Sequence, residues 1–359
     1  MRIVLFAQGL TNRAGIERMT VELSNLLADY YDVYIVIIED FNRKDSPYII
    51  DDKVNIVSLK SAFSILNVRN IFMLRAVLRN IAPNVVITVA TPLVRISAPA
   101  VMGLGIRNIA WEHFNLYAGS RKGVYWKLLS TYLVDRTVVL TNADARNFRN
   151  RKCKNIVVIP NFTSIGRNIP SKCNSNIILA VGRHANQKGF DLLIKAWAKA
   201  NVFEWKLKIV GSGELKEKNI SLAKELGVID SIIFQDSTPE IVKEYQSASC
   251  FILSSRFEGL VMVMIEAKMM GLPCISFDCP TGPSEIIRDG IDGWLVENGN
   301  ISALAETIRL ALSSRDVLME RGRMARADAL MRYSPDAIKN KWIELLEKLE
   351  DSENSTCNK

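Results

Sequence analysis

The first half of the chain alternates short apolar runs with longer stretches in which apolar residues recur at helical spacing. In residues 15–30, for example, Ile16, Met19, Leu23 and Leu27 fall on one helical face. Continuous apolar runs separated by helices are typical of parallel strands that are buried on both faces. This order predicts an α/β unit with a helix-covered parallel sheet. The predicted strands are residues 2–7, 33–38, 54–59, 84–90, 107–111, 136–140 and 155–159.

A polar stretch at residues 160–176 interrupts this pattern, and its Pro, Gly, Ser and Asn residues are typical of a linker. The pattern then starts again, and the last of three closing helices is predicted at residues 334–349. We therefore expect two Rossmann-like domains, residues 1–165 and residues 170–335. The second domain has predicted strands at residues 176–181, 206–210, 232–235, 250–254 and 274–277, and predicted helices at residues 190–200 and 260–270.

Length and composition agree with two globular domains. The chain has 359 residues, of which 48% are hydrophobic and 23% charged, and one α/β domain takes roughly 100–200 residues. No apolar run approaches the roughly 20 residues that span a bilayer, and the first residues do not form a signal peptide, so we expect a cytoplasmic protein. The six cysteines lack Cys-x-x-Cys spacing, and only His113 and His184 could join them around a metal. We therefore expect free thiols, no metal site and no cofactor.

Basic residues are concentrated in the first half of the chain. Residues 1–165 contain 21 Lys and Arg against 12 Asp and Glu, and residues 53–154 contain 16 against 3. Such a charge attracts nucleic acid, phosphorylated ligands or an anionic membrane. We expect no nucleic-acid partner, because no helix-turn-helix, RNP or zinc-finger pattern accompanies the charge.

Two segments interleave these basic residues with apolar ones, as a helix on a membrane surface does. An ordinary core helix with a basic outer face has the same pattern, and both interpretations remain open. The first segment contains Lys60, Phe63, Ile65, Leu66, Arg69, Ile71, Phe72, Leu74, Arg75, Val77, Leu78 and Arg79, and the second contains Tyr117, Arg121, Lys122, Tyr125 and Trp126.

The first candidate for chemistry follows the strand at residues 176–181. The sequence Gly182-Arg183-His184 is followed by Gln187-Lys188-Gly189, which opens a helix. The guanidinium of Arg183 and the ammonium of Lys188 would lie beside a helix N-terminus, where backbone N–H groups already favour an anion. A diphosphate would fit there. The alternative is a pair of surface cations at an ordinary strand-to-helix turn.

The second candidate is the sequence Ser-Ser-Arg-Phe-Glu-Gly at residues 254–259, which leads into the predicted helix at residues 260–270. We expect the carboxylate of Glu258 to share one crevice with the N–H groups of Gly259, Leu260 and Val261 at the carboxyl end of the strand. Glu266 lies on an otherwise apolar helix, where a buried carboxylate needs hydrogen-bond donors such as ribose hydroxyls. A half-exposed Glu266 paired with Lys268 or another cation is the alternative.

These motifs carry a resemblance to a known family. The patterns G-R-x4-K-G-x-D-x-L-I, S-R-F-E-G-x6-E-A, G-x-P and G-P-S-E-I-I-x-D-G-x-D-G occur in this order within residues 182–293. Together they resemble the retaining glycosyltransferases of family 4. Weaker matches at residues 15–18, 111–113 and 141–143 extend the likeness to nearly the whole chain.

The resemblance implies roles for individual residues. Arg183 and Lys188 match the pair on the donor diphosphate, and would be catalytic because they neutralise the departing nucleotide. Glu266 matches the carboxylate that binds the ribose hydroxyls. Glu258 matches the carboxylate beside the transferred sugar, and is implied to be catalytic, with Gly259, Leu260 and Val261 also binding the donor.

Two residues of the first domain also match the family. Gly15 corresponds to a glycine loop that approaches donor phosphate or acceptor, and His113 to a catalytic histidine near the donor sugar. A packed, non-catalytic His113 is an equal alternative, and His184 is interpreted as structural. The chain departs from the family pattern at Ala14, where a glycine is usual and the methyl requires a negative φ. It also lacks the usual proline at Leu260-Val261.

The resemblance implies a GT-B architecture, in which two Rossmann-like domains face a cleft and a final helix, about residues 340–350, crosses back to the first. The first domain would bind the acceptor and the second the donor, a UDP-hexose or UDP-N-acetylhexosamine. The implied reaction is metal-independent, retaining transfer to a saccharide or lipid-linked saccharide in bacterial surface polysaccharide or lipopolysaccharide biosynthesis, on the inner face of the cytoplasmic membrane if the basic surface docks there.

Three other functions were weighed. A nucleotide-sugar epimerase of the same architecture and a catalytically silent sugar-nucleotide-binding partner remain open. A dinucleotide-dependent dehydrogenase is disfavoured, because the glycines at Gly9 and Gly15 do not have G-x-G-x-x-G spacing.

Overall fold

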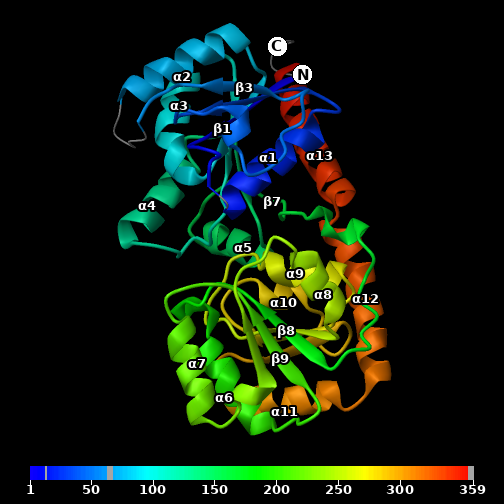
Figure 1. The fold of residues 1–359 in the computed structure, drawn as a ribbon. Helices are drawn as coiled ribbons and strands as arrows, with labels where there is room; N and C mark the ends of the chain where they lie inside the picture. Colours follow the sequence, from blue (N-terminus) through cyan, green and yellow to red (C-terminus); the bar gives the residue numbers. More distant parts are fainter. Residues whose placement is uncertain (13, 63–67, 355–359) are drawn as a thin grey trace. The chain divides into compact units, whose positions relative to one another are not determined.

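The computed structural model describes residues 1–12, 14–62 and 68–354, which form two compact units (Figure 1). Unit 1 comprises Met1–Asn161 together with the chain from Ile338 onward, and unit 2 comprises Phe162–Ala337. Each unit contains one parallel sheet with helices packed against it. The α/β class with two Rossmann-like units, predicted from the sequence, is therefore confirmed.

Unit 1 contains a seven-stranded parallel sheet in the order β3-β2-β1-β4-β5-β6-β7. Helices α2 and α3 pack on one face of its central strands, where Leu74 and Leu78 lie in the core. The strands are β1 (Arg2–Ala7), β2 (Asp32–Ile37), β3 (Asn55–Ser58), β4 (Val85–Val89), β5 (Arg107–Trp111), β6 (Arg136–Val139) and β7 (Ile156–Val158). The helices are α1 (Gly15–Leu27), α2 (Val68–Ile81), α3 (Val94–Val101), α4 (Arg121–Ser130) and α5 (Asn142–Asn150).

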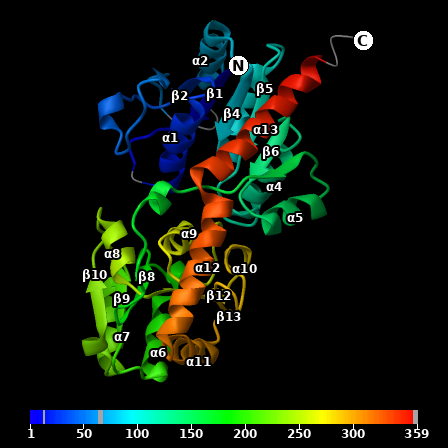
Figure 2. The same cartoon turned by 90° about the vertical axis from the view of Figure 1, so that its right-hand side faces the viewer.

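The last helix, α13 (Pro335–Asn354), completes unit 1. Figure 2 shows this helix, in red, beside the strands of unit 1. Trp342 is buried and packs edge-on against Trp111 of β5, with 5.3 Å between ring centroids. The final helix therefore returns to the first unit, as the fold prediction requires.

Unit 2 contains a six-stranded parallel sheet in the order β10-β9-β8-β11-β12-β13. Helices α6, α7 and α11 share the core on one face, together with Leu318 of α12, and α8, α9, α10 and the end of α12 share the core on the other. The strands are β8 (Ile177–Val181), β9 (Lys206–Val210), β10 (Ile232–Gln235), β11 (Cys250–Leu253), β12 (Cys274–Asp278) and β13 (Gly293–Glu297). The helices are α6 (Phe190–Ala200), α7 (Lys216–Glu225), α8 (Ile241–Ser247), α9 (Met262–Met269), α10 (Pro283–Ile286), α11 (Ile301–Leu312) and α12 (Arg315–Tyr333).

The edge strand β13 was not predicted from the sequence. It pairs with β12 in register from Gly293 opposite Cys274 to Glu297 opposite Asp278. A Cβ at Gly293 would lie 2.3 Å from the main-chain oxygen of Cys274, so only glycine permits this close approach. The strand starts directly at a glycine-rich turn, which the hydrophobic pattern alone assigns to a loop.

Within the described residues, no helix is both long and apolar enough to cross a membrane. The five cysteines in that part of the chain are free and buried, and Cys357 lies outside it. Burial raises the pKa of the Cys173 thiol to about 11 and that of Cys279 to about 12, so both stay protonated at neutral pH.

Candidate functional site

Two loops of unit 2 meet at the carboxyl edge of its sheet. One follows β8 and the other follows the neighbouring strand β11. The Ser254 hydroxyl donates to the main-chain oxygen of Lys188 at 2.9 Å, and the Arg256 N–H donates to the oxygen of Gln187 at 2.8 Å. The two sequence motifs, some 70 residues apart, are thus joined into one structure at the edge where α/β sheets bind ligands.

Glu258 lies at the centre of this structure and is buried. Its Oε1 accepts from Lys188 Nζ at 2.6 Å and from Ser255 Oγ at 2.6 Å, and its Oε2 accepts from Gln187 Nε2 at 3.3 Å. The Lys188–Glu258 contact is an ion pair between mostly buried side chains. A buried carboxylate with these donors has a fixed orientation, and it holds the ammonium at the same edge.

Arg256 fastens the second loop to the start of α6. Its guanidinium makes two bonds to the carboxylate of Asp191, at 2.9 and 2.7 Å, and one to the main-chain oxygen of Asn186 at 2.8 Å. Burial alone would raise the pKa of Asp191, but the hydrogen bonds and charge of Arg256 outweigh it, and the pKa is lowered. This bidentate pair fixes the geometry of both loops.

Two glycines allow the close backbone approaches at the site. Gly189 has a φ of +60°, and a Cβ there would lie 2.2 Å from the main-chain oxygen of Ser254. Gly282 has a φ of +102°, and its Cβ would lie 2.3 Å from the oxygen of Gly259. The Thr281 hydroxyl also donates to the main-chain oxygen of Glu258. Residues 280–282 therefore form a third segment of the site, which contacts the main chain at Glu258 and Gly259.

The predicted start of the following helix is wrong by two residues. Helix α9 begins at Met262, and Val261 is its N-cap with φ −83° and ψ 86°. Gly259, Leu260 and Val261 precede the helix, so their N–H groups do not form its first turn. The contacts of Thr281 and Gly282 with the chain at residues 258–259, together with burial of Val261 in the core, hold this segment out of helical geometry.

Glu266 is buried on α9, as its sequence context indicated. The Tyr245 hydroxyl from α8 donates to its Oε2 at 3.1 Å. The half-exposed alternative is wrong, because Glu266 is buried. Lys268 is also fully buried, and it contacts Asp292 and Asp328.

The two residues that follow Gly182, Arg183 and His184, have different surroundings. Arg183 is exposed, and no hydrogen bond or ion pair joins its side chain to another described residue. His184 is buried, with its ring nitrogen Nδ1 2.9 Å from Asn219 Nδ2 and its ring packed edge-on against Phe190. Burial, with a smaller effect of Lys216, lowers the pKa of His184. These contacts fit the structural role expected for it.

In unit 1, His113 follows β5 and packs against Trp111, with 4.3 Å between ring centroids. Burial lowers the pKa of His113 to about 3, so the ring is neutral at physiological pH. Its Nε2 is buried and has no hydrogen-bond partner among the described residues. The neighbouring Glu112 is buried, accepts hydrogen bonds from Thr91 Oγ1 and from the Phe114 N–H at 2.9 Å, and forms an ion pair with Lys127 Nζ at 3.5 Å.

Gly15 is the first residue of α1, and Ala14 is the N-cap. Ala14 has φ −127° and ψ 169°, so its methyl causes no strain, and the condition set by the sequence is met. A cavity of about 160 Å³ lies nearby, at the carboxyl edge of β1, β2 and β4; its lining includes Gly9, Asn12, Ile16, Glu17, Glu39 and Ala90. Ala90 has a φ of +74°, a strained value for a residue with a Cβ.

The family model for glycosyl transferases group 1 matches residues 162–328, which include the whole of the unit 2 site. An uncharacterized glycosyltransferase of Haemophilus influenzae is 31% identical to the chain, over 96% of this chain and 99% of that protein. The chain belongs to the group 1 glycosyltransferases. A lipopolysaccharide 1,6-galactosyltransferase of Salmonella typhimurium is 29% identical over 70% of this chain and 74% of that protein.

The fold of this glycosyltransferase is shared with solved structures. The Anabaena protein Alr3699/HepE, in complex with UDP, superposes with a TM-score of 0.81 over 97% of this chain and all of that chain, at 17% identity. The fold is therefore GT-B, as the resemblance implied.

Three residues of the glycosyltransferase site were not singled out from the sequence: Gln187, Ser255 and Thr281. Each contacts Glu258 through its side chain. The role of Ser255 could have been predicted, because a hydroxyl three residues before a carboxylate in the same loop can donate a hydrogen bond to it. Gln187 and Thr281 carry no such local signal, since they reach Glu258 from other loops.

Proposed function

We propose that this glycosyltransferase transfers a sugar, with retention of anomeric configuration, from a UDP-hexose or UDP-N-acetylhexosamine held by unit 2 to a saccharide acceptor held by unit 1. The observation that carries the proposal is the Lys188–Glu258 pair at the carboxyl edge of β8 and β11, together with exposed Arg183 in the loop after β8. The UDP in the Anabaena complex supports the choice of nucleotide. The galactosyl transfer named for the Salmonella relative supports a hexose.

In this proposal each charged side chain has one task. Arg183 and Lys188 bind the diphosphate and offset the charge that grows on it as the glycosidic bond breaks, which is the largest single contribution in many enzymes. Glu258, oriented by Ser255 and Gln187, accepts hydrogen bonds from hydroxyls of the transferred sugar. Glu266, oriented by Tyr245, accepts hydrogen bonds from the ribose hydroxyls.

In this proposal the leaving group needs no metal ion. Arg183 and Lys188 are proposed to offset the charge of the diphosphate, and the sequence has no Asp-x-Asp motif. Among the described residues, no group of three His, Cys, Asp or Glu side chains is placed to hold a metal ion. The neutral His113 of unit 1 would act as a hydrogen-bonding group near the sugar, since its lowered pKa prevents it from acting as a cation.

The acceptor is proposed to be a lipid-linked or membrane-bound saccharide used in assembly of a bacterial surface polysaccharide. The lipopolysaccharide acceptor class named for the Salmonella relative supports this. A surface on unit 1 supports it independently. Helix α4 and its flanks expose two cations, Arg121 and Lys122, and four aromatic residues, Phe114, Tyr117, Tyr125 and Tyr132.

This assignment moves the proposed membrane contact away from α2. Leu74 and Leu78 of that helix are buried in the core, and Arg75 donates to the main-chain oxygens of Ala100 and Met102. Leu74, Leu78 and Arg75 therefore fit the core-helix interpretation, whereas Phe72 of the same helix is 68% exposed. Phe63, Ile65 and Leu66 lie outside the described residues. Tyr125 on α4 and Tyr132, two residues after its end, are 69% and 61% exposed.

Vesicle co-sedimentation tests the membrane contact. Wild type should bind vesicles that contain anionic lipid, and 1 M salt should release it, because screening then acts within roughly 3 Å. Arg121→Glu with Lys122→Glu should abolish binding, since each cation near the surface contributes about 1 kcal/mol. Arg146→Glu with Arg151→Glu, the same charge change at two other exposed residues of unit 1, is the matched control. Equal binding by the α4 variant and the control would reject this surface.

Product analysis tests the reaction. The protein is incubated with a panel of nucleotide sugars, with and without a bacterial membrane extract, and the products are separated. Transfer to the extract supports the proposal, an epimerised nucleotide sugar without extract supports the epimerase alternative, and binding without turnover supports the silent partner. Calorimetry with UDP then tests the pose: Glu266→Ala should weaken UDP binding, whereas Glu258→Gln should keep it while activity collapses.

A further inference from the structure

A fully buried cation lies on α9, two residues after Glu266. Lys268 has no exposed surface, and its Nζ lies 3.1 Å from Asp292 Oδ2 and 2.8 Å from Asp328 Oδ2. It also donates to the main-chain oxygen of Ile286. Taking three charged groups out of water is costly, and only good geometry with further hydrogen bonds offsets that cost.

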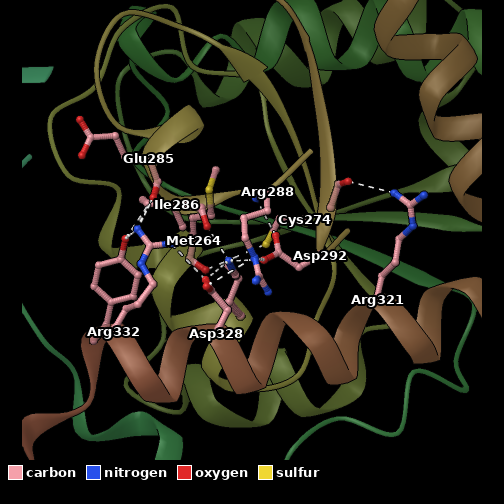
Figure 3. A network of polar contacts seen from close by, with 12 residues as sticks. Met264, Cys274, Glu285, Ile286, Arg288, Asp292, Arg321, Asp328 and Arg332 are labelled. Atoms are coloured by element: carbon pink, nitrogen blue, oxygen red, sulfur yellow. Dashed lines mark hydrogen bonds and ion pairs between the residues drawn. The ribbon is translucent and has the colours of Figure 1, made fainter. Parts of the chain in front are cut away.

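Two arginines complete this charge cluster. Arg288 Nε lies 2.9 Å from Asp292 Oδ2 and 3.5 Å from Asp328 Oδ1. Arg332 Nη1 lies 3.2 Å from Asp328 Oδ2, and its Nη2 donates to the main-chain oxygen of Glu285. Figure 3 shows Arg288, Asp292 and Asp328 pointing toward one another, while the carboxylate of Glu285 points away.

The cluster joins three segments of unit 2. Lys268 comes from α9, Asp328 comes from α12, which lies alongside α9 (Figure 2), and Asp292 follows α10. Residues 280–282, just before α10, are those that support Glu258 and Gly259 through Thr281 and Gly282. The same charge cluster thus contacts the helix that carries Glu266 and the segment that follows residues 280–282, which themselves contact Glu258 and Gly259.

We propose that Lys268, Asp292 and Asp328 are positioning residues of the donor site. They set the position of α9 relative to residues 280–292, and through it the position of Glu266 relative to Glu258. None of the three touches the donor in this scheme, which rests on the donor site proposed above. The charges define one arrangement, because each charged atom must meet its own partner, whereas apolar contacts would accept neighbouring arrangements with little loss.

Stability and donor affinity separate this role from a purely structural one. Lys268→Met should lower the melting temperature, since it takes from two buried carboxylates the one fully buried cation that they share. Lys268→Met combined with Asp328→Leu removes a charge pair, and should recover most of the lost stability. In both variants the Kd for UDP should rise at least fivefold and kcat/KM should fall at least tenfold, because the arrangement is no longer fixed.

Two controls sharpen the test. Leu304→Ala on α11 changes the core on the other face of the sheet, and should lower the melting temperature without changing the Kd for UDP. Asp292→Asn keeps the shape of the side chain and removes its charge, and should raise the Kd for UDP even if the other variants do not fold. Wild-type Kd and kcat/KM in the stable double variant, or in Asp292→Asn, would show that the cluster only stabilises unit 2.

Glu266→Ala distinguishes failure of this inference from failure of the donor site. If Glu266→Ala weakens UDP binding and the cluster variants do not, only the positioning role is wrong. If Glu266→Ala itself binds UDP with wild-type affinity, the donor pose is wrong and the positioning role falls with it.

Discussion

The ion pair between Lys188 and Glu258 predicts an asymmetry between its two partners. The pair is 2.6 Å long, with side-chain exposures of 17% and 8%. At an effective dielectric constant of about 20, two charges at this distance attract by about 6 kcal/mol, and most of that gain offsets their desolvation. Lys188→Met leaves the buried carboxylate with its bonds to Ser255 and Gln187 but without a cation, whereas Glu258→Gln leaves an ammonium that water can still reach.

The expected loss of stability is therefore about 2 kcal/mol for Lys188→Met and about 1 kcal/mol for Glu258→Gln. For a unit the size of unit 2, these values lower the melting temperature by about 4–8 °C and about 2–4 °C. In the double variant the loss should be smaller than the sum of the single losses by about 1 kcal/mol, because the two side chains contact each other.

The assay combines thermal unfolding with donor kinetics in the same buffers. Lys188→Met should also lower kcat/KM by about 10²- to 10³-fold, the usual effect of removing one group that stabilises developing charge. Losses that add without coupling would mean that the pair is not formed in solution. A kcat/KM within tenfold of wild type in Lys188→Met would refute the role of this lysine at the diphosphate.

Four further predictions follow from the same structure. Arg183→Ala should lower kcat/KM by about 10²-fold with little change in melting temperature, because its side chain is exposed; a stable, fully active variant would contradict this. Transfer should persist in EDTA, and loss of activity that Mg²⁺ or Mn²⁺ restores would disprove metal independence. Gly189→Ala should cost more than about 1 kcal/mol of stability, because a Cβ cannot fit against the main-chain oxygen of Ser254 at positive φ. Gly15→Ala, with open space around it, should cost less. Equal unfolding curves for the two variants would count against the close approach of Gly189 to Ser254. The pKa of His113 is lowered to about 3, so as the pH falls below about 6.5 its imidazole is protonated first in the unfolded chain, and folding loses up to about 1.4 kcal/mol per pH unit. His113→Gln should therefore lose stability less steeply than wild type between pH 6 and pH 4. The same pH dependence of the melting temperature in both proteins would show that folding does not lower this pKa.

The hydrophobic pattern predicted the strands well, because a strand buried on both faces needs an unbroken apolar run. The start of α9 could not be predicted in the same way, since Leu260 and Val261 are acceptable in a helix and are kept out of one by Thr281 and Gly282, some 20 residues away in the sequence. Packing from a distant loop outweighed local propensity there.

The candidate site was likewise predictable in its residue types and less so in its contacts. The sequence indicated that Lys188 and Glu258 lie at the same edge of the sheet, but their direct pairing depends on the approach of Gly189 to Ser254. Lys268 drew attention only as a partner for Glu266. Its true partners come from a loop and from α12, and burial of a lysine on an apolar helix is the one local sign that they exist.

The contact of Trp342 with Trp111 has a consequence for how the chain folds during synthesis. Unit 1 is assembled from two stretches of sequence, and all of unit 2 is encoded between them. On the ribosome, the strands of unit 1 are made first, yet the surface around Trp111 stays uncovered until α13 emerges. Unit 2 can complete its core earlier, because its residues are contiguous in the sequence. The unit that is translated first is thus the one that finishes folding last.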